Sequence, residues 1–272
     1  MYRFLLRPAW LVFHAVVVGA VVLMVNLGIW QLDRLDERKD FNAQVRAQSQ
    51  TSPVPLRTIL DGLADGTLTP ETAEWLPVSA EGTYLEDQVV EFNVSQGGRA
   101  GENVLTALAL DDPSVGGGEV VIVNRGFIPL ATPVPPPPAT SISIVGYVRP
   151  TEVRERGGLT DADDGGVLTE VRRIDVARLA QQYTGDVAPI YVQMIGGVPA
   201  PQVGDPEPVV LPELSNGPHL SYAIQWFVFA LCVVIGWFLA VRRSVRQRIR
   251  DREALERTVT EPAQDADVSV TA

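Results

Sequence analysis

The stretch AWLVFHAVVVGAVVLMVNLGIW, from Ala9 to Trp30, and the stretch YAIQWFVFALCVVIGWFLAV, from Tyr222 to Val241, decide the fold of this chain. Each has about the 20 apolar residues that a helix needs to cross the hydrocarbon core of a bilayer. A cleaved signal peptide is the alternative interpretation of the first stretch, because Arg3 and Arg7 give it a short basic start. Its apolar run is longer than a signal sequence needs, however, and no Ala-x-Ala-like cleavage site follows it. We therefore predict two retained transmembrane helices.

Basic residues set the expected orientation of these spans. Five arginines directly after the second span place that end in the cytoplasm: Arg242, Arg243, Arg246, Arg248 and Arg250. The first span alone is ambiguous, but two spans put both termini on the same side of the membrane, so the second span decides. We expect a cytoplasmic N-terminus (residues 1–8), a first span (9–30), an extracytoplasmic domain (31–218), a second span (219–241) and a cytoplasmic tail (242–272) that is basic and then disordered.

The domain between the spans is acidic. Residues 31–218 contain 13 Lys and Arg against 27 Asp and Glu, a net charge of −14, which does not attract nucleic acid or anionic lipid. The one cysteine, Cys232, lies inside the second span, so the domain folds without a disulfide on its apolar core. A single lysine and the lack of an Arg- and Ser-rich transit segment favour a bacterial plasma membrane over a mitochondrion.

Short apolar or alternating runs predict a mainly β-structured domain. The first helix is expected to continue to about Gln48, where Pro53 and Pro55 stop it. Seven candidate strands follow: Val78–Tyr84, Gln88–Val94, Glu102–Leu110, Glu119–Ile128, Ser141–Val148, Val167–Arg172 and Ala188–Met194. Ile174–Tyr183 has apolar residues at helical spacing and predicts a short helix. The fold class is therefore two transmembrane α-helices that flank a mainly antiparallel β-barrel or sandwich with α+β character.

Glycine and proline mark the connections between these elements. Residues 61–76 are rich in turn signals, and Gly97-Gly98 and Gly116–Gly118 are expected as turns between paired strands. Residues 130–139 form a stiff proline-rich connector. Residues 198–218 are rich in Pro and Gly and are expected to be a tether that returns the chain to the membrane.

Composition excludes most catalytic and metal-binding arrangements from the domain. It has no histidine or cysteine, which removes Ser-His-Asp and Cys-His triads and Cys/His zinc sites. Its only lysine is Lys39, beside the membrane, and its only methionine is Met194, so neither a Ser-Lys dyad nor a soft-ligand copper site is expected. Asp161–Gly166 resembles a calcium loop superficially, but Gly165 and Arg172 stand where oxygen ligands are needed. We predict that the protein is not an enzyme, with catalysis by paired carboxylates as the weakest hypothesis.

The remaining candidate site is at the membrane face, where the second span begins. A helix that starts near residue 218 carries His219, Tyr222 and Trp226 on one side. With both termini inside, this turn lies at the outer leaflet, where the first span ends in Trp30-Gln31. An imidazole between flat aromatic walls suits a porphyrin, whose iron takes a proximal histidine. An aromatic belt, in which His219 bonds a backbone carbonyl, is the alternative.

The second histidine, His14, belongs near the opposite leaflet. About 16 residues separate it from Trp30, which is a rise of roughly 24 Å along a helix. The two histidines therefore cannot share one iron. We expect His14 to pack between the helices or to form a helix–helix hydrogen bond.

Several separated motifs resemble the Surfeit locus protein 1 family. They occur in the family's order and, with the two spans, cover nearly the whole chain: Leu27-Gly-Ile-Trp-Gln-Leu-Asp-Arg34 followed by Lys39, Gly82-Thr-Tyr84, Val123-Asn-Arg-Gly-Phe-Ile-Pro129, Gly146-Tyr-Val-Arg149 and His219-Leu-Ser-Tyr-Ala-Ile-Gln-Trp-Phe227. The chain departs from the family pattern at Phe127, where a Trp is frequent, and at Asn216-Gly-Pro218, where a polar run is frequent.

The resemblance implies a non-enzymatic assembly factor for haem–copper cytochrome c oxidase, which helps haem a reach subunit I. In bacterial relatives the histidine of the second span is thought to ligate haem a, and His219 matches it, with Trp30 and Gln31 as the matching first-span pair. The implied cofactor is thus a transiently bound haem a with His219 on the iron. Arg125 matches the Arg of the third motif. It can reach a haem propionate or a partner carboxylate, or it can merely close a turn, and both interpretations stay open.

The same resemblance implies the partners. They are subunit I, other oxidase or respiratory supercomplex subunits, and the enzymes of haem a synthesis, in addition to the lipid bilayer. The alternative function is a scaffold or accessory subunit that stabilises the oxidase complex without binding haem.

Overall fold

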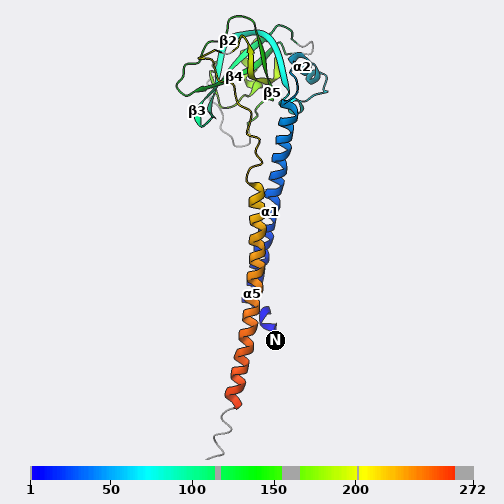
Figure 1. Cartoon of the computed structure of the whole chain (residues 1–272), viewed down its shortest axis with the longest axis vertical. Coiled ribbons are helices and arrows are strands. Elements are labelled where there is room, and N and C mark those ends of the chain that lie inside the picture. Colours follow the sequence, from blue (N-terminus) through cyan, green and yellow to red (C-terminus); the bar gives the residue numbers. More distant parts are fainter. Residues whose placement is uncertain (1, 114–117, 155–165, 201, 261–272) are drawn as a thin grey trace, which may run out of the picture. The chain divides into compact units, whose positions relative to one another are not determined.

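The computed structural model describes residues 2–113, 118–154, 166–200 and 202–260. The chain divides into two compact units, Met1–Phe41 with Ser215–Ala272, and Asn42–Leu214. The first unit holds two long apolar helices and the second a mixed, mainly antiparallel β-structure (Figure 1). The predicted fold class is therefore confirmed. The predicted membrane boundaries at residues 30 and 218 stay predictions.

The two long helices are α1 (Pro8–Ser49) and α5 (His219–Thr260), and a short 3₁₀ turn, η1 (Tyr2–Leu6), precedes α1. Each contains an 18-residue window with a mean hydropathy of 2.3, of which only 6% is buried inside the protein. A core helix of a soluble protein would bury such a window, so exposed apolar side chains suggest membrane anchoring. Helix α1 ends one residue beyond the predicted Gln48. Most of the predicted disordered tail, residues 261–272, lies outside the described residues.

Two cross-helix hydrogen bonds fix the register of α1 against α5. Trp237 Nε1 donates to His14 Nδ1 at 2.9 Å, and His219 Nδ1 lies 2.9 Å from Gln31 Oε1. The contacts are 17 residues apart along α1 and 18 apart along α5, so the helices run antiparallel. A Cβ at Gly28 would lie 2.8 Å from the Phe227 ring, and its absence lets that ring approach the α1 backbone. The helix–helix hydrogen bond expected of His14 is confirmed.

The second unit contains seven strands and four short helical elements among its described residues. In chain order they are β1 (Val54–Pro55), α2 (Leu56–Ala64), α3 (Pro70–Ala73), β2 (Pro77–Gln96), β3 (Arg99–Leu110), β4 (Val120–Pro129), β5 (Ile142–Pro150), β6 (Glu170–Val171), α4 (Val176–Leu179), η2 (Ala180–Gln182) and β7 (Val187–Val198).

Five of the strands close into a barrel. The order is β2-β3-β4-β7-β5, and β2 also pairs with β5, which completes the ring. Strand β2 can pair twice because its first part, Pro77–Gly82, pairs with β5 and the remainder, from Gly82 to Gln96, pairs with β3. All these pairs are antiparallel except β4 with β7, which is parallel. The short strands β1 and β6 add to β2 in parallel.

Apolar residues fill both faces of this sheet. Along β4, Val121 and Val123 join a cluster that packs against α2, whereas Val120 and Ile122 join a cluster that packs against α4. Successive side chains of a strand point to opposite faces, so β4 is covered on both sides. Its buried, uninterrupted apolar run follows from that position.

Three local predictions were wrong. The candidate strands Val78–Tyr84 and Gln88–Val94 are one strand, β2, whose register shifts between Tyr84 and Gln88 without breaking the sheet. Turn signals at residues 61–76 hid the end of α2 and the whole of α3; α2 buries Leu56, Ile59 and Leu60 although Gly62 lies inside it. Strand Val167–Arg172 shrinks to the two residues of β6.

Other local predictions hold. Ile174–Tyr183 contains α4 and η2, and the Asp175 side chain caps α4 by accepting from Arg178 N at 3.2 Å. Gly97 and Gly98 form the β2–β3 turn with φ of 59° and 76°, as glycine permits. Gly116 and Gly117, and the rejected calcium loop up to Gly165, lie outside the described residues.

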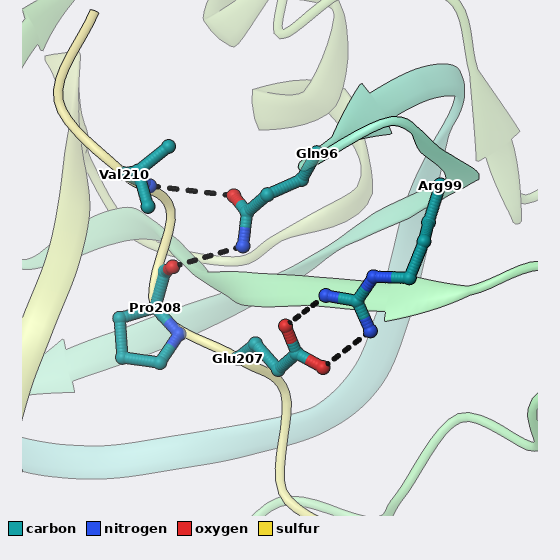
Figure 2. A network of polar contacts seen from close by, with 5 residues as sticks. All are labelled: Gln96, Arg99, Glu207, Pro208 and Val210. Atoms are coloured by element: carbon teal, nitrogen blue, oxygen red, sulfur yellow. Dashed lines mark hydrogen bonds and ion pairs between the residues drawn. The ribbon is translucent and has the colours of Figure 1, made fainter.

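The predicted tether is fastened to the barrel over residues 202–210, which we call the strap. Glu207 exchanges backbone hydrogen bonds with Phe127, at 2.7 and 2.8 Å. Its carboxylate binds the Arg99 guanidinium in two contacts of 2.9 and 2.5 Å (Figure 2). The Gln96 side chain bonds the backbone at Pro208 and at Val210, at 3.2 and 3.3 Å (Figure 2).

Gly126 allows the strap to cross β4. Its φ is 138°, and a Cβ there would lie 2.3 Å from the Glu207 carbonyl oxygen. Only glycine gives both the backbone conformation and the clearance. The Gly of the Arg-Gly-Phe motif is therefore required by the strap.

Candidate functional site

His219 is the first residue of α5, where the sequence predicts that the second span begins. The Pro218 carbonyl accepts from Tyr222 N at 3.2 Å and from the Ser221 hydroxyl at 2.7 Å. Gly217 precedes this turn with φ of 63°. The imidazole is thus held at a helix start, half-buried rather than enclosed.

Gln31 orients the His219 ring. The Gln31 side-chain oxygen lies 2.9 Å from His219 Nδ1. Because a carbonyl oxygen only accepts, this pairing puts the proton on Nδ1 and leaves the lone pair on Nε2. A hydrogen bond of this kind on the remote nitrogen is the usual support of a metal-ligating histidine.

Gly217 keeps the Nε2 edge open. A Cβ at this position would lie 3.3 Å from His219 Cδ2 and 3.4 Å from Nε2, which is close enough to crowd a ligand on that nitrogen. Both the tautomer and the clearance at Nε2 therefore suit an axial ligand to a metal. The described residues contain no group of three or more His, Cys, Asp and Glu that could hold a bare metal ion.

The aromatic residues predicted around His219 have other partners. Trp30 is 49% exposed and lies under the Arg34 guanidinium, 5.7 Å from the ring centroid. Trp226 packs edge-on to Phe229 at 6.2 Å, and Tyr222 is 48% exposed. The structure brings Gln31 to His219, whereas the predicted aromatic wall stays a prediction.

His14 is committed to a different contact. The Trp237 indole only donates, so His14 Nδ1 must accept and its proton lies on Nε2. The ring also packs against Trp10 and Phe13, at centroid distances of 5.6 and 6.0 Å. In this arrangement neither nitrogen offers a free lone pair, so His14 is a helix-packing residue.

Arg125 lies in the barrel unit and is only 6% exposed. Its Nη1 donates to Gln88 Oε1 at 2.8 Å and to the Pro135 carbonyl at 3.2 Å, and its guanidinium lies 5.4 Å from the Tyr84 ring centroid. Burial lowers the pKa of Arg125, while the charges of Tyr84 and Asp205 oppose that change. Arg125 therefore ties β4 to the proline-rich connector and does more than close a turn.

Sequence reasoning did not assign a role to Tyr84 or to Met194 beside it. The Tyr84 hydroxyl donates to Met194 Sδ at 3.6 Å, and burial raises the pKa of Tyr84 to about 12. Tyr84 closes the Gly-Thr-Tyr motif, so the available signal was the motif itself. It did not show that Tyr84 and Arg125, about 40 residues apart in sequence, meet in space.

A second polar cluster of the barrel has a structural explanation. Arg149, from the Gly-Tyr-Val-Arg motif, stacks on Trp75 at 3.8 Å and pairs with Glu74 at 3.5 Å. Nearby, burial raises the pKa of Glu91 to about 7, although Asn103 donates to its carboxylate at 2.8 Å. These contacts lie between neighbouring strands and connectors, where they fasten the barrel.

Comparison with known proteins decides the family. The model of the SURF1 family matches residues 18–231. This range contains α1 from residue 18 onward, the whole barrel and the first part of α5. This chain belongs to the SURF1 family. Gln31, Arg125 and His219 lie inside the matched SURF1 region, whereas His14 and Trp237 lie outside it.

The similar SURF1-like proteins cover most of this chain. Uncharacterized SURF1-like proteins of Mycobacterium bovis and Mycobacterium tuberculosis are each 32% identical over 257 residues, which is 92% of this chain and 89% of theirs. A SURF1-like protein of Monosiga brevicollis is 27% identical over 243 residues, covering 82% and 85%. The SURF1 family is generally associated with cytochrome c oxidase assembly and is not known as a family of enzymes.

Proposed function

We propose that this chain is a membrane-anchored assembly factor for haem–copper cytochrome c oxidase and that it holds haem a at His219 for transfer to subunit I. The observation that carries the proposal is the contact between Gln31 and His219 Nδ1 at 2.9 Å. It connects two of the motifs that define the family resemblance, one on each apolar helix. A histidine with only a structural role at this position would not need open space beside Nε2.

The residues at the start of α5 fit a haem ligand. His219 would supply Nε2 as the proximal ligand, Gln31 would fix the ring and its tautomer, and Gly217 would give the ligand room. Haem a bound there would present its iron to a single imidazole of this chain. Trp30, Tyr222 and Trp226 are exposed or half-buried on the same two helices, where their rings can cover a porphyrin that lies against them.

A single histidine ligand suits transient binding. The chain has two histidines, and His14 is bonded to Trp237 at the other cross-helix contact. His219 would then be the one histidine of this chain that holds the haem iron, so a recipient subunit would compete with a single imidazole.

The expected placement follows from the charges. The arginines after the second span put both termini in the cytoplasm of a bacterial plasma membrane and the barrel on the outer side. His219 then lies at the outer leaflet. Subunit I is the expected recipient, other oxidase or supercomplex subunits are expected neighbours, and haem a synthesis enzymes are the expected donors.

The test is a haem spectrum of the detergent-purified full chain after co-expression with the enzymes of haem a synthesis. We expect a haem a signal in the wild type that is lost in His219→Ala and kept in His14→Ala. Gln31→Leu should keep the signal but bind haem about 10–100-fold more weakly, since it removes only the supporting hydrogen bond. A wild-type protein without a haem spectrum, purified from cells shown to contain haem a, would refute haem binding and favour the scaffold that does not bind haem.

A further inference from the structure

A cavity of about 310 Å³ opens in the barrel unit between the end of β7, the proline-rich connector and the strap. Its wall is about equally polar and apolar. Ile142, Met194 and the prolines 136–138 form the apolar part, and Val203 stands at its rim. Arg125 and Tyr84 supply polar groups to the same wall. A cavity of this size that combines an apolar surface with convergent polar side chains has the character of a small-molecule site.

Among the described residues the buried Arg125 charge has no ion-pair partner within contact distance, although the Asp205 charge acts on it. The ion pairs of the described residues neutralise other cations, among them Arg57, Arg99 and Arg149, but none of them involves Arg125. Its two hydrogen-bond acceptors, the Gln88 amide and the Pro135 carbonyl, are neutral. A guanidinium removed from water is stabilised most by an anion that it can bind directly.

Arg125 lines the cavity and has N–H donors that its two hydrogen bonds do not use. A guanidinium has five N–H groups, and the hydrogen bonds of Arg125 to Gln88 and Pro135 both use Nη1. In the described part of the chain, neither Nε nor Nη2 of Arg125 is a fully buried atom without a partner. They therefore keep access to the open volume, in a side chain that is itself only 6% exposed.

We propose that this cavity binds a small monocarboxylate with an apolar body, whose carboxylate pairs with Arg125. The apolar part would lie along Ile142 and Met194, and the Tyr84 ring would face it from beside the guanidinium. Asp205 also lines the cavity, where its carboxylate accepts from Gln202 N at 2.7 Å. That negative charge repels any carboxylate ligand and repels a dianion more strongly, so a monoanion is favoured over a dianion.

The strap sets the shape of this site. Gln202, Val203, Asp205 and Pro206 form one of its walls. The adjoining Glu207 is held by the Arg99 guanidinium (Figure 2) and by the Phe127 backbone. The wall is therefore anchored rather than loose, and the cavity exists before any ligand arrives. This preorganisation lowers the entropic cost of binding.

The test uses the full chain, made without haem a, in nanodiscs of zwitterionic phosphatidylcholine. Hexanoate labelled with ¹³C at its carboxyl carbon is titrated and followed by NMR, with 1-hexanol, hexylamine and adipate as comparison ligands. We expect saturable hexanoate binding and clearly weaker binding of the alcohol, the amine and the dianion. Equal binding of hexanol and hexanoate, or no saturable binding of hexanoate, would overturn the proposal.

Variants locate the binding. Arg125→Gln should weaken hexanoate about 10–100-fold, since it removes a charged hydrogen-bond donor. Because that variant removes a buried anchor and can fail to fold, Val203→Glu provides the second test: it places a negative charge on a fully exposed rim residue and should also weaken binding. Val153→Glu, the same change at a 78% exposed residue outside the cavity, is the matched control and should bind normally. Unchanged binding in Val203→Glu would show that hexanoate sits elsewhere.

The proposal is independent of haem. His219→Ala should bind hexanoate like the wild type, because Arg125 and all the described residues that line the cavity belong to the barrel unit. Loss of hexanoate binding in His219→Ala would contradict a separate barrel site.

Discussion

Neutralising Glu91 should stabilise the barrel at neutral and alkaline pH. Glu91 lies on β2 and accepts a hydrogen bond from Asn103 Nδ2 at 2.8 Å, across to β3. Burial, and to a lesser degree the Glu152 charge, raises the pKa of Glu91 from its ordinary value of 4.5 to about 7, against the opposing effects of Asn103 and Arg149. Glu91→Gln keeps an oxygen that can accept from Asn103 but removes the charge that the fold disfavours.

The difference between pKa values of 4.5 and about 7 corresponds to roughly 3 kcal/mol of folding free energy. Below pH 4.5 the Glu91 carboxyl is protonated in both the folded and the unfolded state, so its ionisation does not lower the folding stability. As the pH rises to 7, the unfolded chain releases the proton first and the wild type loses stability over that window. Above pH 7 the carboxylate is charged in both states and the full cost is present. The free energy of unfolding of Glu91→Gln should therefore exceed that of the wild type by about 2–3 kcal/mol at pH 8 and by little at pH 4.5.

Urea unfolding of the full chain in detergent, read by pulse proteolysis of the barrel, measures this difference. Glu81→Gln is the matched control, because it makes the same change at an exposed position of the same strand and should shift stability by less than about 0.5 kcal/mol. The reasoning would be refuted if the difference in free energy of unfolding between wild type and Glu91→Gln did not change between pH 4.5 and 8. It would also be refuted if the Glu91→Gln barrel were less stable than the wild type at pH 8.

Three further predictions concern the strap and the spans. Gly126→Ala should cost about 3 kcal/mol or more of barrel stability and make the strap susceptible to limited proteolysis, because the new Cβ meets the Glu207 carbonyl at 2.3 Å with φ at 138°; an intact, protease-resistant strap would contradict it. Trp237→Phe removes the hydrogen bond to His14 and should weaken the pairing of the spans by about 0.6–2 kcal/mol in a steric-trap or crosslinking assay, and an unchanged pairing energy would count against that contact. Arg99→Met should change barrel stability little, since its ion pair with Glu207 is half exposed; a double-mutant cycle with Glu207→Gln measures the coupling, and a coupling as strong as that of a buried ion pair would be inconsistent with that exposure.

The long helices and most strands could be predicted because their signals are local. Apolar length alone marks α1 and α5, and alternating or buried apolar runs mark β3, β4 and β7. The closure of the barrel could not be read, because it depends on β2 pairing with two partners through different parts of its length. Glycine and proline hid α2, whose stability comes from packing Leu56, Ile59 and Leu60 on the barrel rather than from helix propensity.

The candidate site was predicted in part for similar reasons. Helical spacing and equal depth put Gln31 near His219, and the two are in contact. The same spacing does not fix side-chain rotation, so Trp30 turns to Arg34 and Trp226 to Phe229. The strap was missed because its hold on the barrel uses backbone atoms and single side chains, which leave no periodic pattern in the sequence.

The parallel pairing of β4 with β7 also has a consequence for how the barrel folds while a ribosome is still releasing the chain. Strand β7 is the last of the ring in sequence, yet it lies between β4 and β5. A nascent chain that has emerged only as far as Pro150 can join β5, β2, β3 and β4 side by side, but both outer strands then present unpaired backbone groups. Closure waits for residues 187–198, and the strap and the second span follow directly behind them. Chains that stop before β7 should therefore self-associate through β4 and β5, which light scattering of such truncations would detect, whereas the full chain seals its own edges shortly before α5 is synthesised.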